Sequence, residues 1–115
     1  MSITPEIQAL VDRLNQELGE IEQEATEGEN LLRQLMSIFS NNPSLIQFFA
    51  YFQTTRFFVV NARRRIRETI EELSTQPINP QIMTESGEDL ATLLGEVIET
   101  KIRSRNLLNR LRDLS

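Results

Sequence analysis

Four arginines lie within five positions in the middle of the chain and form a candidate basic patch: Arg63, Arg64, Arg65 and Arg67. Clustered guanidinium groups bind phosphate readily, so the patch could contact nucleic acid or a nucleotide. Successive helical residues point about 100° apart, so the four cannot share one face. Three glutamates also follow within five residues. We therefore favour pairing with acidic side chains of another helix or of a second chain, and keep a nucleic-acid-binding regulator as an alternative.

Glutamates three residues apart recur along the chain: Glu17 with Glu20, Glu68 with Glu71, Glu85 with Glu88, and Glu96 with Glu99. Carboxylates at this spacing share a helix face and could hold Mg²⁺ against the phosphates of a nucleotide. In this respect the sequence resembles all-helical nucleotide pyrophosphohydrolases of the MazG type, which would imply a carboxylate-metal nucleotide hydrolase. The second element of that family's pattern, Glu-x-x-Asp, does not occur in this sequence. Since glutamate-rich helices contain such pairs by chance, the hydrolase is the second alternative.

The chain contains no histidine and no cysteine. Their absence removes the commonest general base, the commonest metal ligand, every thiolate and every disulfide. The sequence also contains no glycine-rich phosphate loop and no nucleophile paired with a base. We therefore expect no catalytic residue, no cofactor and no metal, and hence a protein that is not an enzyme.

Polar residues interrupt the apolar faces near the middle of the expected helices and form a candidate polar core layer: Arg56, Lys101, Ser104 and Gly28. The small Ala25 and Gly28 leave room opposite the cations, and Glu24 or Glu27 is close enough to supply a counter-charge. A buried cation without a partner is strongly destabilising, so pairing or exposure of the charged end is expected. We expect this layer to fix the register of the bundle, with binding of a small anion or of a partner's carboxylate as the alternative.

Six of the seven aromatic residues lie between Phe48 and Phe58, and residues 45–60 are apolar nearly all round a helix. Two other helices of so small a chain cannot easily cover that circumference. The surplus forms a candidate interface: Ile46, Tyr51, Phe57, Phe58 and Val60. Aromatic residues concentrate at the centres of interfaces, so we expect a homodimer. A groove for a helix of another protein and a pocket for an apolar ligand stay open.

The elements that must position these residues are three long helices, expected over residues 4–40, 43–74 and 85–114. In the first, apolar residues recur every seven positions from Ile7 to Phe39, which is typical of coiled-coil packing. Gly28 could break this helix and give a fourth. Because the repeat continues in phase across Gly28, we favour one continuous helix.

The expected helix ends follow from proline and its neighbours. Thr4 and Asn42 are candidate caps, each followed by a proline suited to the first helical position. Pro77 and Pro80 predict a connection of about ten residues, with the third helix beginning near Thr84 or Ser86. The result is an elongated antiparallel bundle in a single domain over residues 1–115.

The formal charge of −5 is unevenly distributed. Residues 1–42 carry a net charge of −6, residues 43–76 carry +2 and the remainder carries −1, so the first two segments should attract each other. The acidic total disfavours nucleic acid as a partner. No run approaches the ~18 apolar residues of a membrane span, and the first residues lack the pattern of a signal peptide. We therefore expect a cytoplasmic, non-catalytic interaction module, such as an adaptor, assembly factor or small regulatory subunit, that binds itself or another protein.

Overall fold

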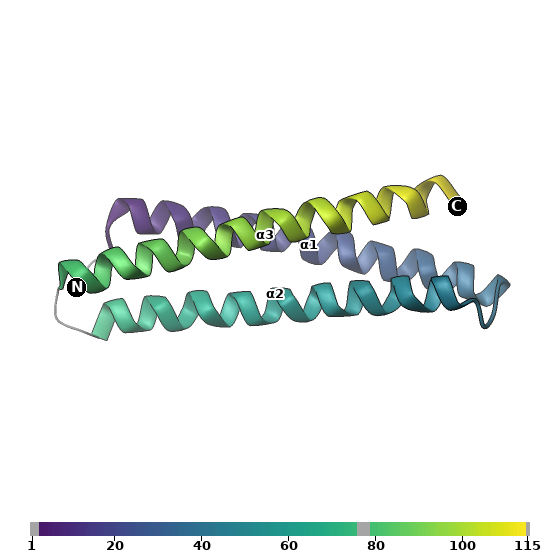
Figure 1. Ribbon diagram of the computed structural model, residues 1–115, viewed down its shortest axis with the longest axis horizontal. Coiled ribbons are helices and arrows are strands. Elements are labelled where there is room, and N and C mark those ends of the chain that lie inside the picture. Colours follow the sequence, from purple (N-terminus) through teal and green to yellow (C-terminus); the bar gives the residue numbers. More distant parts are fainter. Residues whose placement is uncertain (1–2, 76–78, 115) are drawn as a thin grey trace.

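Three long helices run side by side along the length of the protein (Figure 1). The computed structural model describes residues 3–75 and 79–114. These residues form α1 (Pro5–Ile38), α2 (Pro43–Thr75) and α3 (Pro80–Leu114), with α2 antiparallel to the other two (Figure 1). The molecule measures 58 × 19 × 16 Å, so the predicted elongated all-α bundle is confirmed.

Side-chain caps start the first two helices where the sequence predicts them. Thr4 Oγ1 accepts a hydrogen bond from the backbone N–H of Ile7 at 3.3 Å, and Pro5 occupies the first helical position. Asn42 Oδ1 accepts from the N–H groups of Ser44 and Leu45 at 3.0 and 3.2 Å. These bonds satisfy backbone donors that have no partner within the helix.

The predicted start of the third helix near Thr84 or Ser86 is wrong, because α3 begins at Pro80. Asn79 Oδ1 accepts from the N–H of Gln81 at 2.9 Å, which repeats the asparagine-proline start of α2. Pro80 lacks only an N–H that would be unpaired in any first turn, so it starts a helix as readily as it ends one. Of the predicted connection, residues 76–78 lie outside the described residues.

The first helix passes through Gly28 without a break, as predicted. The hydroxyl of Thr26 bonds to the carbonyl oxygen of Glu22 within α1 at 2.9 Å and does not act as a cap. Gly28 is buried, and a Cβ added to it would lie 2.6 Å from the Cε2 and Cζ atoms of Phe52. The glycine therefore gives the Phe52 ring space against the backbone of α1.

The core consists of two hydrophobic clusters along the bundle axis. The first spans the beginning of α1, the end of α2 and the first half of α3, and includes Leu14, Leu18, Val59, Ile66 and Val97. The second, at the opposite end of the bundle, includes Ala25, Leu32, Phe52, Leu108 and Leu111. The seven-residue repeat of α1 contributes to both clusters, so α1 is the shared wall of the core.

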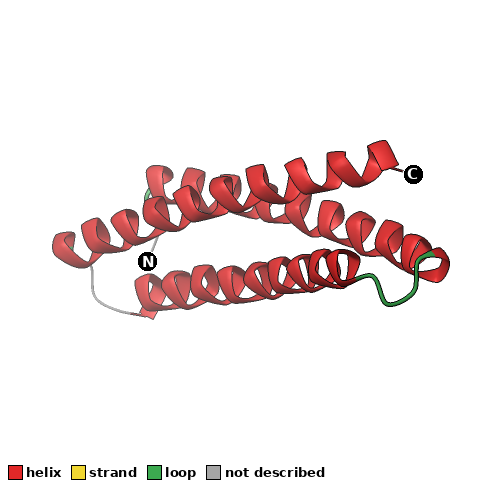
Figure 2. Ribbon diagram, turned by 45° about the vertical axis from the view of Figure 1, so that its right-hand side comes forward, coloured by secondary structure: helices red, strands yellow, loops and turns green. Residues whose placement is uncertain are grey.

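The three helices do not contact one another equally. α1 packs extensively against both α2 and α3, whereas α2 and α3 contact each other much less. Figure 2 shows α2 set apart from α3. The bundle is therefore open between α2 and α3, and parts of both helices lack cover there.

Candidate interaction surfaces

The N-terminal half of α2 has an exposed face with almost no charge. Residues 43–62 contain one charged residue, Arg56. On the outside of α2, alternate spacings of four and three residues separate five exposed positions, which we name the outer seam: Ile46, Ala50, Gln53, Phe57 and Val60. The large side chains of this seam are well exposed: Ile46 is 52% exposed, Phe57 66% and Val60 57%. Four-three spacing is the pattern by which one helix packs along another, so α2 carries a second packing face besides its core face.

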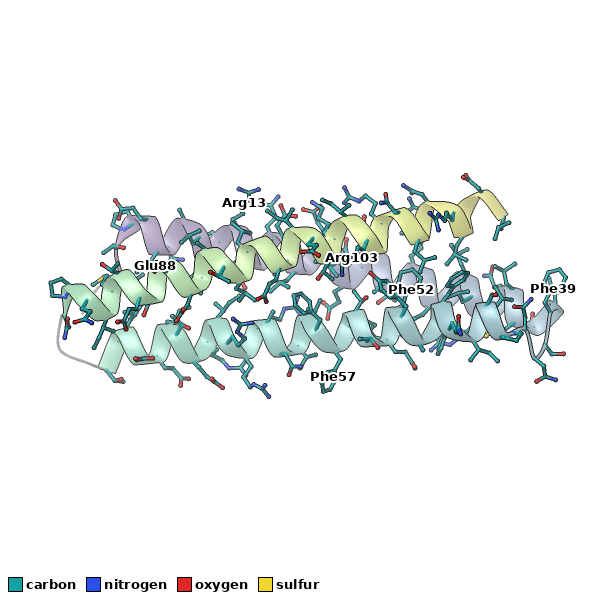
Figure 3. All side chains as sticks on the ribbon, in the orientation of Figure 1. Arg13, Phe39, Phe52, Phe57, Glu88 and Arg103 are labelled. Atoms are coloured by element: carbon teal, nitrogen blue, oxygen red, sulfur yellow. The ribbon has the colours of Figure 1, made fainter. Side chains whose placement is uncertain are left out.

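The five residues of the candidate interface divide between two environments. Ile46, Phe57 and Val60 lie on the outer seam, and Figure 3 shows Phe57 pointing away from the other helices while Phe52 points inward. Tyr51 and Phe58 are half-buried and pack against the second and first core clusters, respectively. The chain thus covers part of its aromatic surplus and leaves the rest exposed. Sequence reasoning missed Ala50 and Gln53 because neither is strongly apolar, although their spacing could have revealed them.

A depression of about 300 Å³ lies between α1 and α2, beside the outer seam, and includes Glu29, Arg56, Phe57 and Val60 among its lining residues. Arg56 Nη1 donates to Glu29 Oε1 at 2.7 Å. The Glu29 side chain is 2% exposed, whereas that of Arg56 is 48% exposed. Among the described residues, Glu29 is the one charged residue buried in the core. A molecule that covered the outer seam would also shield this ion pair from water, which strengthens its electrostatic attraction.

The predicted polar core layer forms only in part. Ser104 is fully buried and Thr55 is 4% exposed, and each lies in its helix between members of the two core clusters. Gly28, in contrast, lies against Phe52 and not against a cation. Arg56 reaches Glu29 at the edge of the bundle and Lys101 pairs with Glu17 and Glu20, so the expectation that Glu24 or Glu27 supplies the counter-charge of this layer is wrong. A cation this close to the surface pairs with the acid on its own side of α1.

Ion pairs join the acidic side of α1 to α3. Lys101 Nζ lies 2.6 Å from Glu17 Oε1 and 3.2 Å from Glu20 Oε1. The hydrogen bond from Lys101, followed by its charge, holds the pKa of Glu20 below its ordinary value. The hydrogen bond to Glu17 raises the pKa of Lys101, and the hydrogen bond to Glu20 raises it by a smaller amount. Both shifts favour the charged forms, so the pair persists across neutral pH.

Two arginines of α3 extend this row of ion pairs. Arg105 donates to Glu24 at 2.8 Å and to Glu20 at 3.4 Å. Arg112 donates from Nε and Nη2 to the two carboxylate oxygens of Glu27, both at 2.7 Å. The hydrogen bonds to the carboxylates raise the pKa of both arginines, and the bond from Arg112 lowers the pKa of Glu27. Electrostatic attraction between α1 and its neighbours is therefore present, but α3 takes a larger share of it than sequence analysis predicts.

The basic patch does not form one surface: Arg63, Arg64, Arg65 and Arg67 take different directions. Arg63 Nη1 donates to Glu22 Oε2 of α1 at 3.0 Å. Arg65 Nη1 donates to Glu96 Oε2 of α3 at 3.3 Å. Arg64 pairs within α2, with the glutamate four residues further on, while Arg67 is exposed. The cross-helix pairing favoured by the sequence is thus observed for two of the four.

Two of the four glutamate pairs that suggest metal binding are engaged in ion pairs. Glu17 and Glu20 converge on Lys101, while Glu96 and Glu99 pair with arginines. Within residues 3–75 and 79–114, no group of three or more potential metal-ligating side chains lies together. None of the helices, as far as their residues are described, combines the length and apolar character needed to cross a membrane.

Comparisons with protein-family models, curated proteins and solved structures find no match to this chain.

Proposed function

We propose that this chain is a non-catalytic helical interaction module that forms a homodimer through the outer seam of α2. The observation that supports the proposal is the exposed and regularly spaced outer seam, in a stretch, residues 43–62, that contains a single charged residue. At 1.5 Å per residue this face is about 30 Å long. An adaptor, assembly factor or small regulatory subunit needs such a face, because helix-to-helix contact requires length and regular spacing more than a deep pocket.

The spacing of the outer seam favours an antiparallel arrangement centred on Gln53. Ile46 and Val60 lie seven residues on either side of Gln53, so antiparallel pairing brings Ile46 of one copy beside Val60 of the other. The same pairing places the large Phe57 beside the small Ala50 of the second copy. A two-fold axis through Gln53 then makes both halves of the interface identical, as a dimer of this kind requires. A polar residue at the centre of such a seam fixes its register.

Light scattering on the purified chain tests the proposal. The wild-type protein should have twice its chain mass of 13.3 kDa. Phe57→Glu should have the mass of one chain, because a carboxylate at the interface would lose its hydration. Ser74→Glu is the matched control, because it adds the same charge at an exposed position of α2 outside the outer seam. A monomeric wild-type protein, or a dimer that survives Phe57→Glu, contradicts the proposal.

Cross-linking tests the antiparallel register separately. Because the chain contains no cysteine, Gln53→Cys supplies a single thiol per copy. On the two-fold axis the two thiols lie close enough for a disulfide, so mild oxidation should give a covalent dimer. Ser74→Cys, far from the axis, should remain uncross-linked under the same conditions. If Ser74→Cys cross-links as fast as Gln53→Cys, the proposed register is wrong.

A further inference from the structure

A second surface, separate from the outer seam, lies where α2 and α3 diverge. An open groove of about 460 Å³ runs between the N-terminal half of α2 and the C-terminal half of α3. Phe48 and Tyr51 line it from α2 and Leu107 lines it from α3. All three are half-buried and pack against the second core cluster, so they form an apolar floor that the core supports.

Two arginines of α3, Arg103 and Arg110, also line the groove, together with the amides of Gln47 and Asn106. The C-terminal half of α3 contains five basic residues, and Glu side chains of α1 bind the other three (Lys101, Arg105 and Arg112). Arg103 is 68% exposed, and within the described part of the chain its ion pair lies along its own helix, with Glu99. An exposed pair of this type adds little to stability, so Arg103 can exchange it for a partner's carboxylate. None of the described residues that line the groove is acidic.

The position of the charges limits what the groove can receive. Arg103 and Arg110 are seven residues apart, which is two helical turns or about 10.5 Å along α3. The apolar floor lies beside them, and the groove occupies the side on which the three helices leave the bundle open. An acidic, amphipathic helix satisfies all three features, because its apolar face covers the floor and its carboxylates bind the guanidinium groups.

We propose that this groove binds a helix of another protein that carries carboxylates about two turns apart beside an apolar stripe. The bound helix completes a four-helix arrangement with α1, α2 and α3. The inference does not depend on self-association, because Phe57 and the rest of the outer seam lie outside the groove.

A peptide selection on the full chain tests this inference. The probe is a library of 21-residue helical peptides with apolar residues fixed at four-three spacing and Glu, Lys, Gln or Ala varied at the flanking positions. Selection on the wild-type protein should enrich glutamates seven residues apart. The affinity of enriched peptides, measured by fluorescence anisotropy, should fall at least tenfold for Arg103→Glu/Arg110→Glu. The same variant should instead enrich lysines at those positions.

The matched control is Arg64→Glu/Arg67→Glu, which makes the same charge change at exposed positions of α2 beyond the groove. This control and Phe57→Glu should both retain the wild-type affinity for the peptides. The inference is overturned if no charged position is enriched, or if enriched peptides bind the groove variant as tightly as the wild type. It is also overturned if a single-stranded oligonucleotide shows the arginine dependence that the peptides lack. Loss of the homodimer in Arg103→Glu/Arg110→Glu would likewise overturn it, because a second copy would then fill the groove.

Discussion

Both halves of α2 pack similar side chains against α1, but only the second half carries many charges on its outer surface. Buried residues recur every seven positions through both halves: Leu45, Phe52, Val59, Ile66 and Leu73. Residues 43–62 nevertheless contain one charged residue, whereas residues 63–75 contain seven. The core-facing side of α2 is therefore apolar along its whole length, whereas its solvent-facing side is nearly uncharged in the first half and highly charged in the second.

The fold requires the buried apolar residues of α2, but it does not require apolar residues on the exposed face of residues 43–62. An exposed helix face remains soluble most simply when it is polar or charged, as residues 63–75 are. The exposed Phe57 and Val60 contribute little to the core, so their position needs another explanation, and contact with a second chain supplies one. The buried seven-residue repeat of α2 is sufficient to explain the bundle. The exposed apolar residues of its first half are not explained by the bundle and favour association with a second chain.

The largest expected effects come from the inner repeat. Phe52→Ala should lower the free energy of unfolding by about 3–5 kcal/mol and Ile66→Ala by about 2–5 kcal/mol, because both leave a cavity in the core. Phe57→Ala should change it by less than about 0.5 kcal/mol in urea denaturation extrapolated to low protein concentration. If Phe57→Ala costs as much as Phe52→Ala in the monomer, the distinction between the inner and outer faces fails.

Two glycines of α1 test how closely the first half of α2 packs. Gly28→Ala should lower stability by about 2 kcal/mol, because the new Cβ meets the ring of Phe52 and overpacks the core. Gly19→Ala has nothing within 4 Å of the new Cβ. It should stabilise the protein by about 0.5–1 kcal/mol through helix propensity. Thermal denaturation of both variants measures the contrast, and two shifts of the same sign would show that Phe52 has room to move.

The two arginine-glutamate pairs between α1 and α2 should differ in strength. Arg56→Met removes the partner of the buried Glu29 and should cost about 1 kcal/mol. Arg63→Met breaks a pair in which both side chains are more than one third exposed, and should cost about 0.5 kcal/mol or less. Chemical denaturation of the two variants provides the comparison. Equal losses would mean that burial of Glu29 adds nothing to its pair.

The smallest expected effect is a dependence on pH that involves α3. The pKa of Glu20 is lowered from its ordinary value of 4.5, first by the hydrogen bond from Lys101. Its contribution to stability is therefore present above pH 4.5 and lost as the pH falls through the lowered value. Lys101→Met should make the urea midpoint less dependent on pH in this acidic range, while Arg64→Met, which breaks an exposed pair within α2, should not. An unchanged acid profile in Lys101→Met would show that Glu20 keeps its pKa without Lys101.

Most of the fold follows from local features of the sequence. The seven-residue repeat of α1 identifies its core face, and its continuity across Gly28 correctly predicts one helix. The predicted start of α3 is wrong because proline can begin a helix as well as end one, and Asn79-Pro80 repeats the Asn42-Pro43 signal. That error is one of interpretation, since the information is present in the sequence.

The candidate surfaces depend on packing geometry that the sequence does not contain. Tyr51 and Phe58 are half-covered because α3 lies on their side of α2, and periodicity alone does not specify on which side α3 packs. Glu29 appears in sequence as one of several glutamates beside the core seam, yet it alone among them is buried. Its burial depends on the side of α1 on which α2 packs, a choice that only the tertiary structure reveals.

Because α2 and α3 contact each other much less than each contacts α1, we expect that each can detach while the other stays in place. Amide hydrogens of α2 and α3 should accordingly exchange with solvent in two separate opening events, and those of the α1 core face should exchange last. A molecule bridging α2 and α3 would merge the two events into one and slow both.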